Sequence, residues 1–379
     1  MDHILPSART WAEIDLGALR HNFTYAKKQS GKKVMCVIKA DAYGHGAVQC
    51  GLYLQSIGAD AFAVACLAEA VELREAGIAK PLLILGYTEP EYAEILAKHA
   101  IIQAVRGEES AAALAAAAQK AGVQVDVHIK IDTGMGRTGI FAQGQEAALA
   151  AAQEIERIYQ IPGIRVKGLF THFSVADTPS EDTYTKWQLE NYLTVLHALE
   201  EKGLRPEICH ASNSAAIMAH PSAHLDMVRE GIILYGLYPD SVPQPDGPLK
   251  PVMTLKSRVA QVRDLPANSS VSYGRTYVSE HPIRTAVITA GYADGHPRRL
   301  SNQAYDIVNG TAYKQIGRIC MDMHMLDITG DTTIRPGDEV VLWGAQGMST
   351  EEVSQIVGTI NYELTCLVTR RSTRVYLGE

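Results

Sequence analysis

The chain has no excess of positive charge and no long apolar segment. Its 379 residues include 35 Lys and Arg against 42 Asp and Glu, which gives a net charge of −7. Domains that bind nucleic acid normally carry a basic surface, so we expect no nucleic-acid partner. The longest alanine-rich run, residues 110–119, is too short and too weakly apolar to cross a bilayer. We therefore expect no membrane association.

Cysteine is scarce, and the cysteines that are present are scattered. No Cys-x-x-Cys occurs, so the cysteine spacing indicates neither a zinc site nor a disulfide framework, and we expect no metal. The amino terminus, Met-Asp-His-Ile-Leu-Pro-Ser, has no basic region followed by a long apolar stretch, as a signal peptide would. Together these absences predict a cytoplasmic protein. The six cysteines are Cys36, Cys50, Cys66, Cys209, Cys320 and Cys366.

What the sequence does contain is an alternation of strand-like and helix-like segments over roughly its first 240 residues. Continuously apolar strands that alternate with helices are typical of a parallel sheet covered by helices. Eight such units predict a (β/α)₈ barrel of the TIM type. A dinucleotide-binding fold is disfavoured because no Gly-x-Gly-x-x-Gly follows the first strand. The expected strands are Val34–Ala40, Ala61–Cys66, Pro81–Gly86, Ile101–Val105, Val125–Asp132, Val166–Phe173, Ile208–Asn213 and Met227–Tyr235.

The pattern changes at a proline-rich segment, Tyr238–Pro248, which we interpret as a linker. Short strand-like runs with turn signals follow it, and they predict a mostly β domain. We expect a strand at residues 1–12 that joins this β domain, a barrel at 13–242 and the β domain itself at 243–379. The expected elements of the β domain are strands at Leu255–Leu265, Thr285–Ala290, Ala304–Val308, Tyr313–Ile319 and Glu339–Trp343, and a helix at Ser349–Val357.

One residue of the first expected strand attracts attention, because Lys39 ends an apolar run and precedes Ala-Asp-Ala-Tyr43-Gly-His-Gly. A charged lysine is costly to bury, so such a position favours an amine with a lowered pKa. This kind of amine forms Schiff bases with pyridoxal 5′-phosphate (PLP) or carbonyl substrates. The alternative is a lysine whose head reaches solvent at the strand end.

Further polar residues lie near the ends of the other expected strands. Functional groups of (β/α)₈ barrels gather at the carboxyl ends of the strands. We therefore expect these side chains at one site: Lys39, Tyr43, Lys130, Asp132, Arg137, His172, Asn213, Ser214 and Arg229.

These segments resemble the motifs of the bacterial alanine racemases, PLP enzymes of fold type III, from near residue 10 to the carboxyl terminus. The resemblance implies that Lys39 carries PLP and that alanine is racemised through a PLP aldimine by two bases, Lys39 and Tyr273. Such an enzyme would supply D-alanine for peptidoglycan. The matching blocks are Val37–Gly46, Lys130–Arg137, Thr171–Phe173, Asn213–Ala216, Arg229–Ile232, Ser272–Gly274, Gly291–Gly295, Arg318–Asp322 and Ile360–Glu363.

The same resemblance assigns roles to the remaining residues. The cofactor would contact Lys39, Tyr43, His172, Ser214, Arg229, Gly231, Ile232 and Tyr362, and the substrate would contact Arg137 and Met321. Lys130 would carry a carbamate that orients Arg137; alternatively, Lys130 pairs with Asp132. Free lysine and tyrosine have pKa values of about 10, so the site must lower the pKa of both bases for them to act at neutral pH.

Arg229 distinguishes this chain from many PLP enzymes, which pair the pyridine nitrogen with a carboxylate. A guanidinium only donates hydrogen bonds, so it would keep the ring nitrogen unprotonated and suppress transamination. Glu230 follows it directly, and we expect Glu230 to point away from Arg229 because adjacent strand residues face opposite ways.

Tyr273 and Met321 lie in the β domain, whereas Lys39 lies in the barrel. The resemblance therefore implies a homodimer in which each β domain completes the active site of the partner. The alternatives are a serine or broad-specificity racemase of the same family, a PLP-dependent decarboxylase and a non-catalytic PLP carrier. Arg229 disfavours a decarboxylase, and the long β domain disfavours a carrier. The bulk of Tyr362 favours a small substrate.

Overall fold

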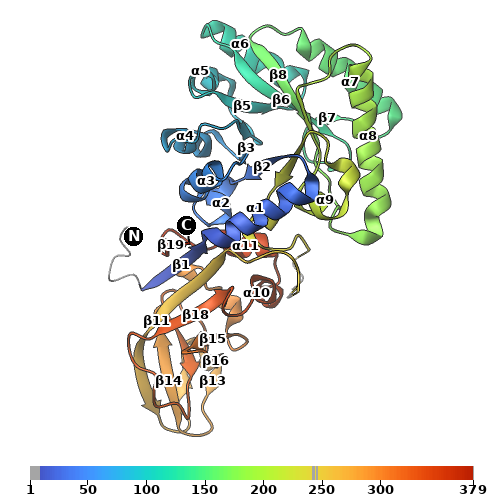
Figure 1. Ribbon diagram of the computed structural model, residues 1–379. Helices are drawn as coiled ribbons and strands as arrows, with labels where there is room; N and C mark the ends of the chain where they lie inside the picture. The colour runs from blue at the N-terminus through green and yellow to red at the C-terminus, as the bar shows by residue number, and fades with distance from the viewer. Residues whose placement is uncertain (1–8, 241–243, 245, 379) are drawn as a thin grey trace. The chain divides into compact units, whose positions relative to one another are not determined.

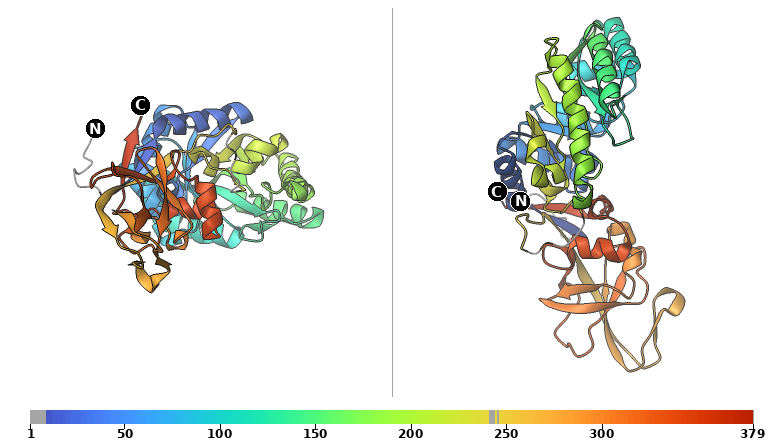
Figure 2. Two further views of the ribbon diagram at one scale, coloured as in Figure 1. Left: turned by 90° about the horizontal axis from the view of Figure 1, so that it is seen from below. Right: turned by 90° about the vertical axis from the view of Figure 1, so that its right-hand side faces the viewer.

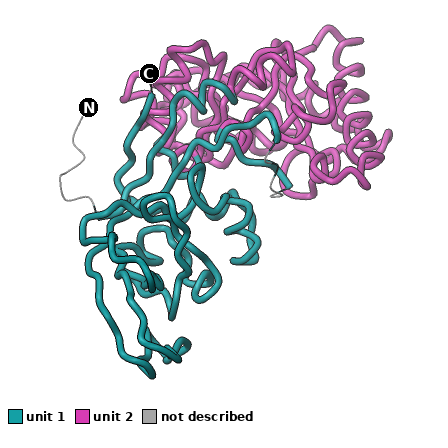
Figure 3. Tube along the Cα trace, turned by 60° about the horizontal axis from the view of Figure 1, so that its bottom comes forward, with its two compact units in different colours: residues 1–22, 43–46, 235–379 teal, residues 23–42, 47–234 magenta. Residues whose placement is uncertain are grey.

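A computed structural model describes residues 9–240, 244 and 246–378. The chain divides into two compact units, which Figure 3 shows in different colours. We call residues 23–42 and 47–234 the barrel unit, and residues 1–22, 43–46 and 235–379 the β unit. Residues 1–8 and part of the expected linker lie outside the described residues, and the expected domain boundaries stay predictions.

The barrel unit contains eight parallel strands in the order β10-β2-β3-β4-β5-β6-β8-β9. The backbone N–H groups of Asp226 and Arg229 bond to the carbonyls of Cys209 (3.1 Å) and Ser212 (3.0 Å), which brings the two ends of this sheet together. The predicted barrel is thereby confirmed. Its strands are β2 (Lys33–Val37), β3 (Ala61–Val64), β4 (Leu82–Ile84), β5 (Ile101–Val105), β6 (Val125–Asp132), β8 (Ile164–Phe170), β9 (Ile208–His210) and β10 (Met227–Glu230); a short strand β7 (Ile140–Phe141) pairs with β6.

Helices cover the outside of this sheet (Figures 1 and 2). Most strands are buried almost throughout because one face meets the barrel interior and the other meets the helices, whereas β8 leaves Arg165 exposed. The helices are α1 (Leu16–Ser30), which begins in the β unit, and α2 (Lys39–Tyr43), α3 (Ala47–Ser56), α4 (Leu67–Glu75), α5 (Ala93–Lys98), α6 (Glu108–Lys120), α7 (Gln145–Tyr159), α8 (Asp182–Glu200) and α9 (Ser214–Ala219). Short 3₁₀ turns lie at η1 (Pro90–Tyr92), η2 (Pro179–Glu181), η3 (Pro221–Ala223) and η4 (Ile232–Tyr235).

Six of the eight expected barrel strands are shorter in the structure than in the prediction, the first and the eighth among them. The first strand ends at Val37, and Lys39 begins a helical turn instead of closing the strand. The eighth strand ends at Glu230, and the expected continuation to Tyr235 is the 3₁₀ turn η4. In both places buried apolar residues follow the end of the strand. Hydrophobicity alone therefore predicted a strand end that lies too far along the chain.

The β unit contains a second sheet in the order β14-β17-β16-β15-β18-β11-β1-β19. Strand β11 also pairs with β14, so the first six strands form a closed ring. Its strands are β1 (Thr10–Asp15), β11 (Met253–Leu265), β14 (Ile283–Ile288), β15 (Tyr305–Val308), β16 (Thr311–Ile316), β17 (His324–Asp327), β18 (Glu339–Gly344) and β19 (Thr373–Leu377); β12 (Ser270–Val271) and β13 (Tyr277–Val278) form a separate hairpin. Its helices are α10 (Thr350–Val357) and α11 (Asn361–Cys366), with 3₁₀ turns η5 (Tyr273–Arg275), η6 (Tyr292–Asp294) and η7 (Arg298–Leu300).

The predicted mostly β domain is confirmed, although the sequence did not predict β17, β19 or α11. In the residues that the structure describes, no helix combines the length and the apolar character that crossing a membrane requires.

Candidate functional site

Lys39 opens a turn of unusual hand. Ala40, Asp41 and Ala42 have φ of 52–54° and ψ of 47–51°, which is the left-handed helical conformation. This conformation costs non-glycine residues roughly 1–2 kcal/mol each. The carboxylate of Glu69 fixes the turn by accepting hydrogen bonds from the N–H groups of Ala40 and Ala65, both at 2.7 Å. Backbone strain that the surroundings hold in place is typical of functional sites.

Arg229 lies at the centre of a buried hydrogen-bond network inside the barrel, with 3% of its surface exposed. Its terminal nitrogens donate to the carbonyls of Thr171 (2.7 Å), His210 (3.1 Å) and Ala211 (2.8 Å). Burial lowers its pKa to about 10, so the guanidinium stays charged at neutral pH. The Nε group of Arg229 donates no hydrogen bond to any described residue, which leaves one donor for a ligand.

The guanidinium also fixes the tautomers of its histidine neighbours. Arginine only donates, so Nδ1 of His210 (3.0 Å) and Nδ1 of His172 (3.3 Å) must both accept. The proton of His210 is then on Nε2, which donates to Nδ1 of His128 at 2.9 Å. Burial lowers the pKa of His128 to about 4 and that of His210 well below its usual value. All three histidines are therefore neutral at neutral pH.

Four cationic side chains act on His172 together. Burial is the main cause of its strongly lowered pKa, and the charges of Arg229, Arg137, Lys130 and Lys39 lower that pKa further. The sequence predicted these residues to meet at one end of the barrel, and their common electrostatic effect on one imidazole shows that the fold brings them together. This end of the barrel therefore carries a concentration of positive charge.

Lys130 is almost fully buried at the end of β6. Its pKa is lowered to about 8, first by burial and then by the charges of Arg137 and Arg229. Asp132 Oδ1 accepts the N–H groups of Gly134 (3.0 Å), Met135 (2.9 Å) and Gly136 (3.0 Å). Across the described chain, no ion pair joins Lys130 to Asp132, so the alternative pairing is wrong: this carboxylate instead shapes the loop that leads to the exposed Arg137.

The loops after β9 and β10 place three further predicted residues next to each other. Ser214 begins α9, and its Oγ accepts the N–H of Gly231 at 3.0 Å in a buried position. Gly231 follows β10, and Ile232 begins η4. A hydroxyl and two successive backbone N–H groups at a strand end are the kind of donors that hold a phosphate.

Tyr43 and Tyr362 belong to the β unit, where their ring centroids lie 6.1 Å apart. Tyr43 is buried and also packs on Tyr235 at 5.0 Å. Burial raises the pKa of Tyr43 well above its usual value, so its hydroxyl stays a hydrogen-bond donor. Tyr362 lies on α11, which the sequence did not predict as a helix.

The side chains of Tyr273 and Met321 are exposed, at 69% and 51%. Both lie in the β unit. Ser272 Oγ donates to the carbonyl of Arg318 and lies 3.4 Å from Cys320 Sγ, so the segments that carry Tyr273 and Met321 are neighbours. Tyr273 and Cys320 also line a common surface depression of about 420 Å³.

His128 and His210 belong to this hydrogen-bond network, but we did not predict them from the sequence. Each lies within an expected barrel strand, as Lys130 and Arg229 do, and that placement is the signal that could have identified them. Glu230 is fully buried, and burial raises its pKa well above the usual value. It forms no ion pair with Arg229 within the described structure. Its electrostatic effect instead falls on Cys36, its partner in register on β2.

The residues at the barrel end fit PLP. The cofactor carries an anionic phosphate and a phenolic oxygen, and its substrate adds a carboxylate, so a cluster of Lys39, Lys130, Arg137 and Arg229 offers complementary charge. Lys39 could supply an amine, Ser214 and Gly231 could supply donors to the phosphate, and Nε of Arg229 could supply a donor to the ring nitrogen. No residue of this set is a carboxylate that would protonate that nitrogen.

Comparisons with known proteins agree with this geometry. The family model described as "Alanine racemase, N-terminal domain" matches residues 14–239, and "Alanine racemase, C-terminal domain" matches residues 252–376. The chain is 42% identical to an alanine racemase of Desulforamulus reducens over 371 residues, which cover 97% of this chain and 99% of that protein.

Solved structures give the same result. An alanine racemase of Clostridium difficile 630 superimposes with a TM-score of 0.91 at 40% identity, covering 98% of this chain and 96% of that one. A histidine racemase of Leuconostoc mesenteroides has a TM-score of 0.88 at 27% identity, covering 98% and 99%. With both family models matched and this similarity extending over nearly its full length, the chain belongs to the alanine racemase family.

Proposed function

We propose that this protein interconverts L-alanine and D-alanine with PLP bound to Lys39. The observation that carries the proposal is the cluster of four cations around His172 at one end of the barrel, with Arg229 fixing the surrounding imidazoles. PLP, when bound, supplies the delocalisation that makes the α-proton of an amino acid acidic. D-alanine made in this way would serve peptidoglycan synthesis in the cytoplasm.

Racemisation requires that a proton leaves one face of the substrate and another arrives on the opposite face. Lys39 would remove or return the proton of D-alanine, and Tyr273 would do so for L-alanine. Lys39 is half-buried, and its amine must be neutral to accept a proton. Tyr273 is exposed on the β unit, where a second molecule can use it.

Arg229 would determine where the proton returns. Its Nε would donate to the pyridine nitrogen and keep that nitrogen unprotonated, which disfavours protonation at the cofactor carbon. The five contacts of its terminal nitrogens hold the guanidinium plane in place. His172, with Nδ1 fixed by Arg229, would pack against the ring.

The remaining predicted residues would bind anionic groups. The phosphate would take the Ser214 hydroxyl and the N–H groups of Gly231 and Ile232, in place of the present bond between Gly231 and Ser214. Tyr43, only four residues along the chain from Lys39, and Tyr362 would add hydroxyl groups. Arg137 and the backbone N–H of Met321 would bind the substrate carboxylate.

A racemisation assay with separate amino acids tests this proposal. Purified protein is incubated with PLP and L-alanine, L-serine or L-histidine, and the D-enantiomer is quantified by chiral chromatography. We expect rapid racemisation of alanine, slower racemisation of serine and none of histidine, because a hydroxyl is a small addition to a pocket whereas an imidazole is not. If PLP-loaded protein does not racemise alanine, the proposal is contradicted. If the protein racemises histidine, histidine rather than alanine is the substrate to consider.

We also propose that the active enzyme is a homodimer with shared active sites, in which Tyr273 and Met321 of one molecule complete the barrel end of the other. Mixing two inactive variants tests this arrangement. Lys39→Ala and Tyr273→Phe, unfolded and refolded together, should regain about a quarter of the wild-type activity, since half of the random dimers then contain one intact site of two. No recovery, with mixed dimers shown by mass, would exclude shared sites.

Lys130 is proposed to react with CO₂ and form a carbamate. Only a neutral amine attacks CO₂, and a pKa of about 8 gives Lys130 an appreciable neutral fraction near pH 8. The resulting anion would pair with Arg137. ¹³C NMR with labelled bicarbonate should show a carbamate signal that grows from pH 7 to pH 9 and is absent from Lys130→Arg. A spectrum without that signal at pH 9 would reject the carbamate.

A further inference from the structure

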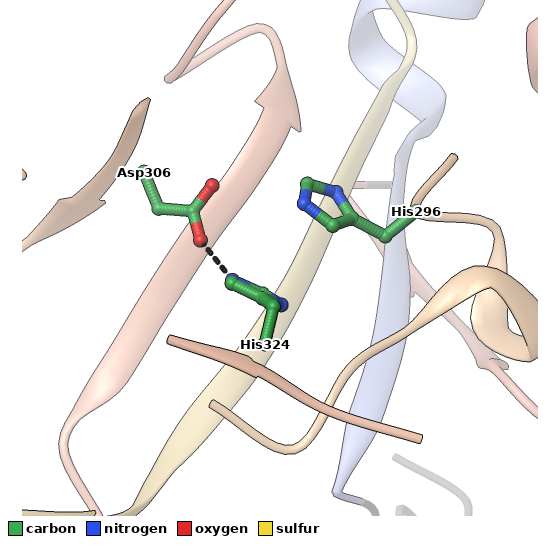
Figure 4. A group of neighbouring side chains, drawn as sticks. All are labelled: His296, Asp306 and His324. Carbon is green, nitrogen blue, oxygen red and sulfur yellow. Dashed lines mark hydrogen bonds and ion pairs between the residues drawn. The ribbon is translucent and has the colours of Figure 1, made fainter. Parts of the chain in front are cut away.

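Three fully buried polar side chains meet in the β unit, apart from all residues discussed so far (Figure 4). His296 lies between η6 and η7, Asp306 lies on β15 and His324 lies on β17. One ligand atom from each, an imidazole nitrogen or a carboxylate oxygen, can be chosen so that all three lie within 4.8 Å of one another. Asp306 and His324 alternate with exposed or half-buried neighbours on their strands, so both point to the inside of the closed ring.

The hydrogen bonds of His324 determine its tautomer. Nδ1 of His324 lies 2.8 Å from the carbonyl oxygen of Ala290, and a carbonyl only accepts, so Nδ1 carries a proton. In the neutral imidazole, Nε2 then has a lone pair, and it faces Asp306 Oδ2 at 2.5 Å. Two atoms with lone pairs at this distance require a positive species between them, which is either a proton or a metal ion.

His296 distinguishes a proton from a metal ion. Its ring stacks on that of His324, with centroids 4.6 Å apart, and Figure 4 shows the three side chains pointing toward one another. Neither ring nitrogen of His296 has a hydrogen-bond partner among the described residues, and the same holds for Asp306 Oδ1. Buried polar atoms without partners are unfavourable and rare. A proton shared by Asp306 and His324 does nothing for His296, whereas a metal ion would use all three side chains.

We propose that His296, Asp306 and His324 bind one divalent transition-metal ion, with Zn²⁺ as the best match to two imidazoles and a carboxylate. Imidazole and carboxylate ligands suit zinc, and a hydrogen bond from the second ring nitrogen to a backbone carbonyl, as His324 makes to Ala290, is the usual support of a metal-binding histidine. Water would complete the coordination. The ion would tie β15, β17 and the segment between η6 and η7 together and so stabilise the β unit.

The geometry needs only a small adjustment to accept the ion. Zinc bonds to nitrogen and oxygen measure about 2.0–2.2 Å, so ligand atoms lie roughly 3–3.5 Å apart around the metal. The 2.5 Å separation of His324 Nε2 and Asp306 Oδ2 would therefore widen, while the nitrogen of His296 would approach. Rotation about side-chain bonds supplies movements of this size without displacing the strands.

Zinc titration of the chelator-treated, PLP-loaded protein tests the proposal. We expect calorimetry to show one equivalent of Zn²⁺ bound per chain, and we expect the thermal unfolding midpoint to rise by several degrees, because a ligand that binds only the folded state stabilises it. Crystals grown with Zn²⁺ should show an anomalous difference peak bounded by His296, Asp306 and His324.

Two variants identify the site. His296→Phe keeps an aromatic ring on His324 but removes a ligand, and it should weaken Zn²⁺ binding by about a hundredfold or more. His281→Phe removes an exposed histidine as a matched control and should bind Zn²⁺ like the wild type. Equal Zn²⁺ binding by wild type and His296→Phe would overturn the proposal. If His296→Phe does not fold, the wild-type anomalous map decides, and a peak elsewhere or none at these residues overturns the proposal.

Discussion

Two groups of neighbouring histidines, one at the barrel end and one in the β unit, differ in what their nitrogens contact. At the barrel end, Arg229 donates to His172 and His210, and His210 donates to His128, so one cation defines the tautomers of a whole row. In the β unit, His324 is fixed by Ala290, but His296 makes no hydrogen bond to a described residue through either nitrogen. The first group is complete without a metal, and the second is not.

Buried polar groups whose hydrogen bonds are complete need no ligand, whereas buried polar groups without partners indicate that a ligand binds there. The barrel-end imidazoles accept or relay hydrogen bonds from the Arg229 guanidinium, whose Nε we propose as a donor to the cofactor. The β-unit imidazoles have no cationic side chain bonded to them among the described residues, and the Asp306 carboxylate next to His324 adds negative charge. We therefore expect the barrel end to attract anions and the β-unit cluster to attract a cation.

The largest expected effect is a loss of racemase activity that leaves Zn²⁺ binding by the β-unit histidines unchanged. Lys39→Ala should lower the rate of alanine racemisation by about 10³-fold or more, because it removes both the covalent attachment of the cofactor and one of the two bases. Zn²⁺ binding to the β unit should not change in this variant. Activity is measured by conversion of L-alanine to D-alanine, and racemisation at the wild-type rate would remove Lys39 from the mechanism.

A second effect concerns the cation of the barrel-end group. Arg229→Glu would place an acceptor at the ring nitrogen, and we expect pyruvate, the transamination product, to rise about tenfold relative to racemisation. Arg229→Lys is the matched control, because it retains a positive charge that cannot accept a hydrogen bond. It should lower turnover without raising pyruvate. Equal pyruvate ratios in both variants would show that the charge at this position does not direct proton return.

The smallest expected effect concerns the pH dependence of stability in metal-free protein. Burial, and then the neighbouring His324, lower the pKa of His296 well below its ordinary value. The unfolded chain therefore binds a proton below about pH 6.5 that the folded chain does not, so stability present above that pH is lost as the pH falls. This loss amounts to about 1.4 kcal/mol per pH unit for one histidine.

His296→Phe should abolish that contribution. Thermal unfolding at pH 7.5 and pH 5.5 would show a smaller fall in midpoint for His296→Phe than for the wild type, while the barrel-end histidines contribute equally to both. His281→Phe again provides the control, because it replaces an exposed histidine of the same unit with the same residue. A fall as large as that of the wild type would mean that His296 is not held neutral.

Much of this architecture could be predicted from the sequence, and its physical basis explains which parts. Barrel strands such as β3 and β4 are continuous apolar runs because both of their faces are buried, and such runs are visible without a structure. Strand β17 was not predicted because His324-Met-Leu-Asp has polar residues at both ends. The side chain of His324 nevertheless faces the interior, where it contacts other polar side chains, and hydrophobicity does not predict such a contact.

The site shows the same division. Lys39, Lys130 and Arg229 could be identified because charged residues next to apolar strands are conspicuous. The left-handed turn from Ala40 to Ala42 could not be predicted, because no glycine marks it and the carboxylate of Glu69, far along the chain, holds it. His296, Asp306 and His324 have no shared spacing in the sequence, and only the closed ring of strands brings them together.

Exchange of the α-proton in D₂O by Tyr273→Phe tests the two-base account most directly. With Lys39 intact and the second base removed, D-alanine should still exchange its α-hydrogen for deuterium, L-alanine should not, and neither should racemise at an appreciable rate. Mass spectrometry of each recovered enantiomer measures both quantities. Equal exchange of the two enantiomers, or racemisation at the wild-type rate, would contradict the assignment of Lys39 and Tyr273 to opposite faces.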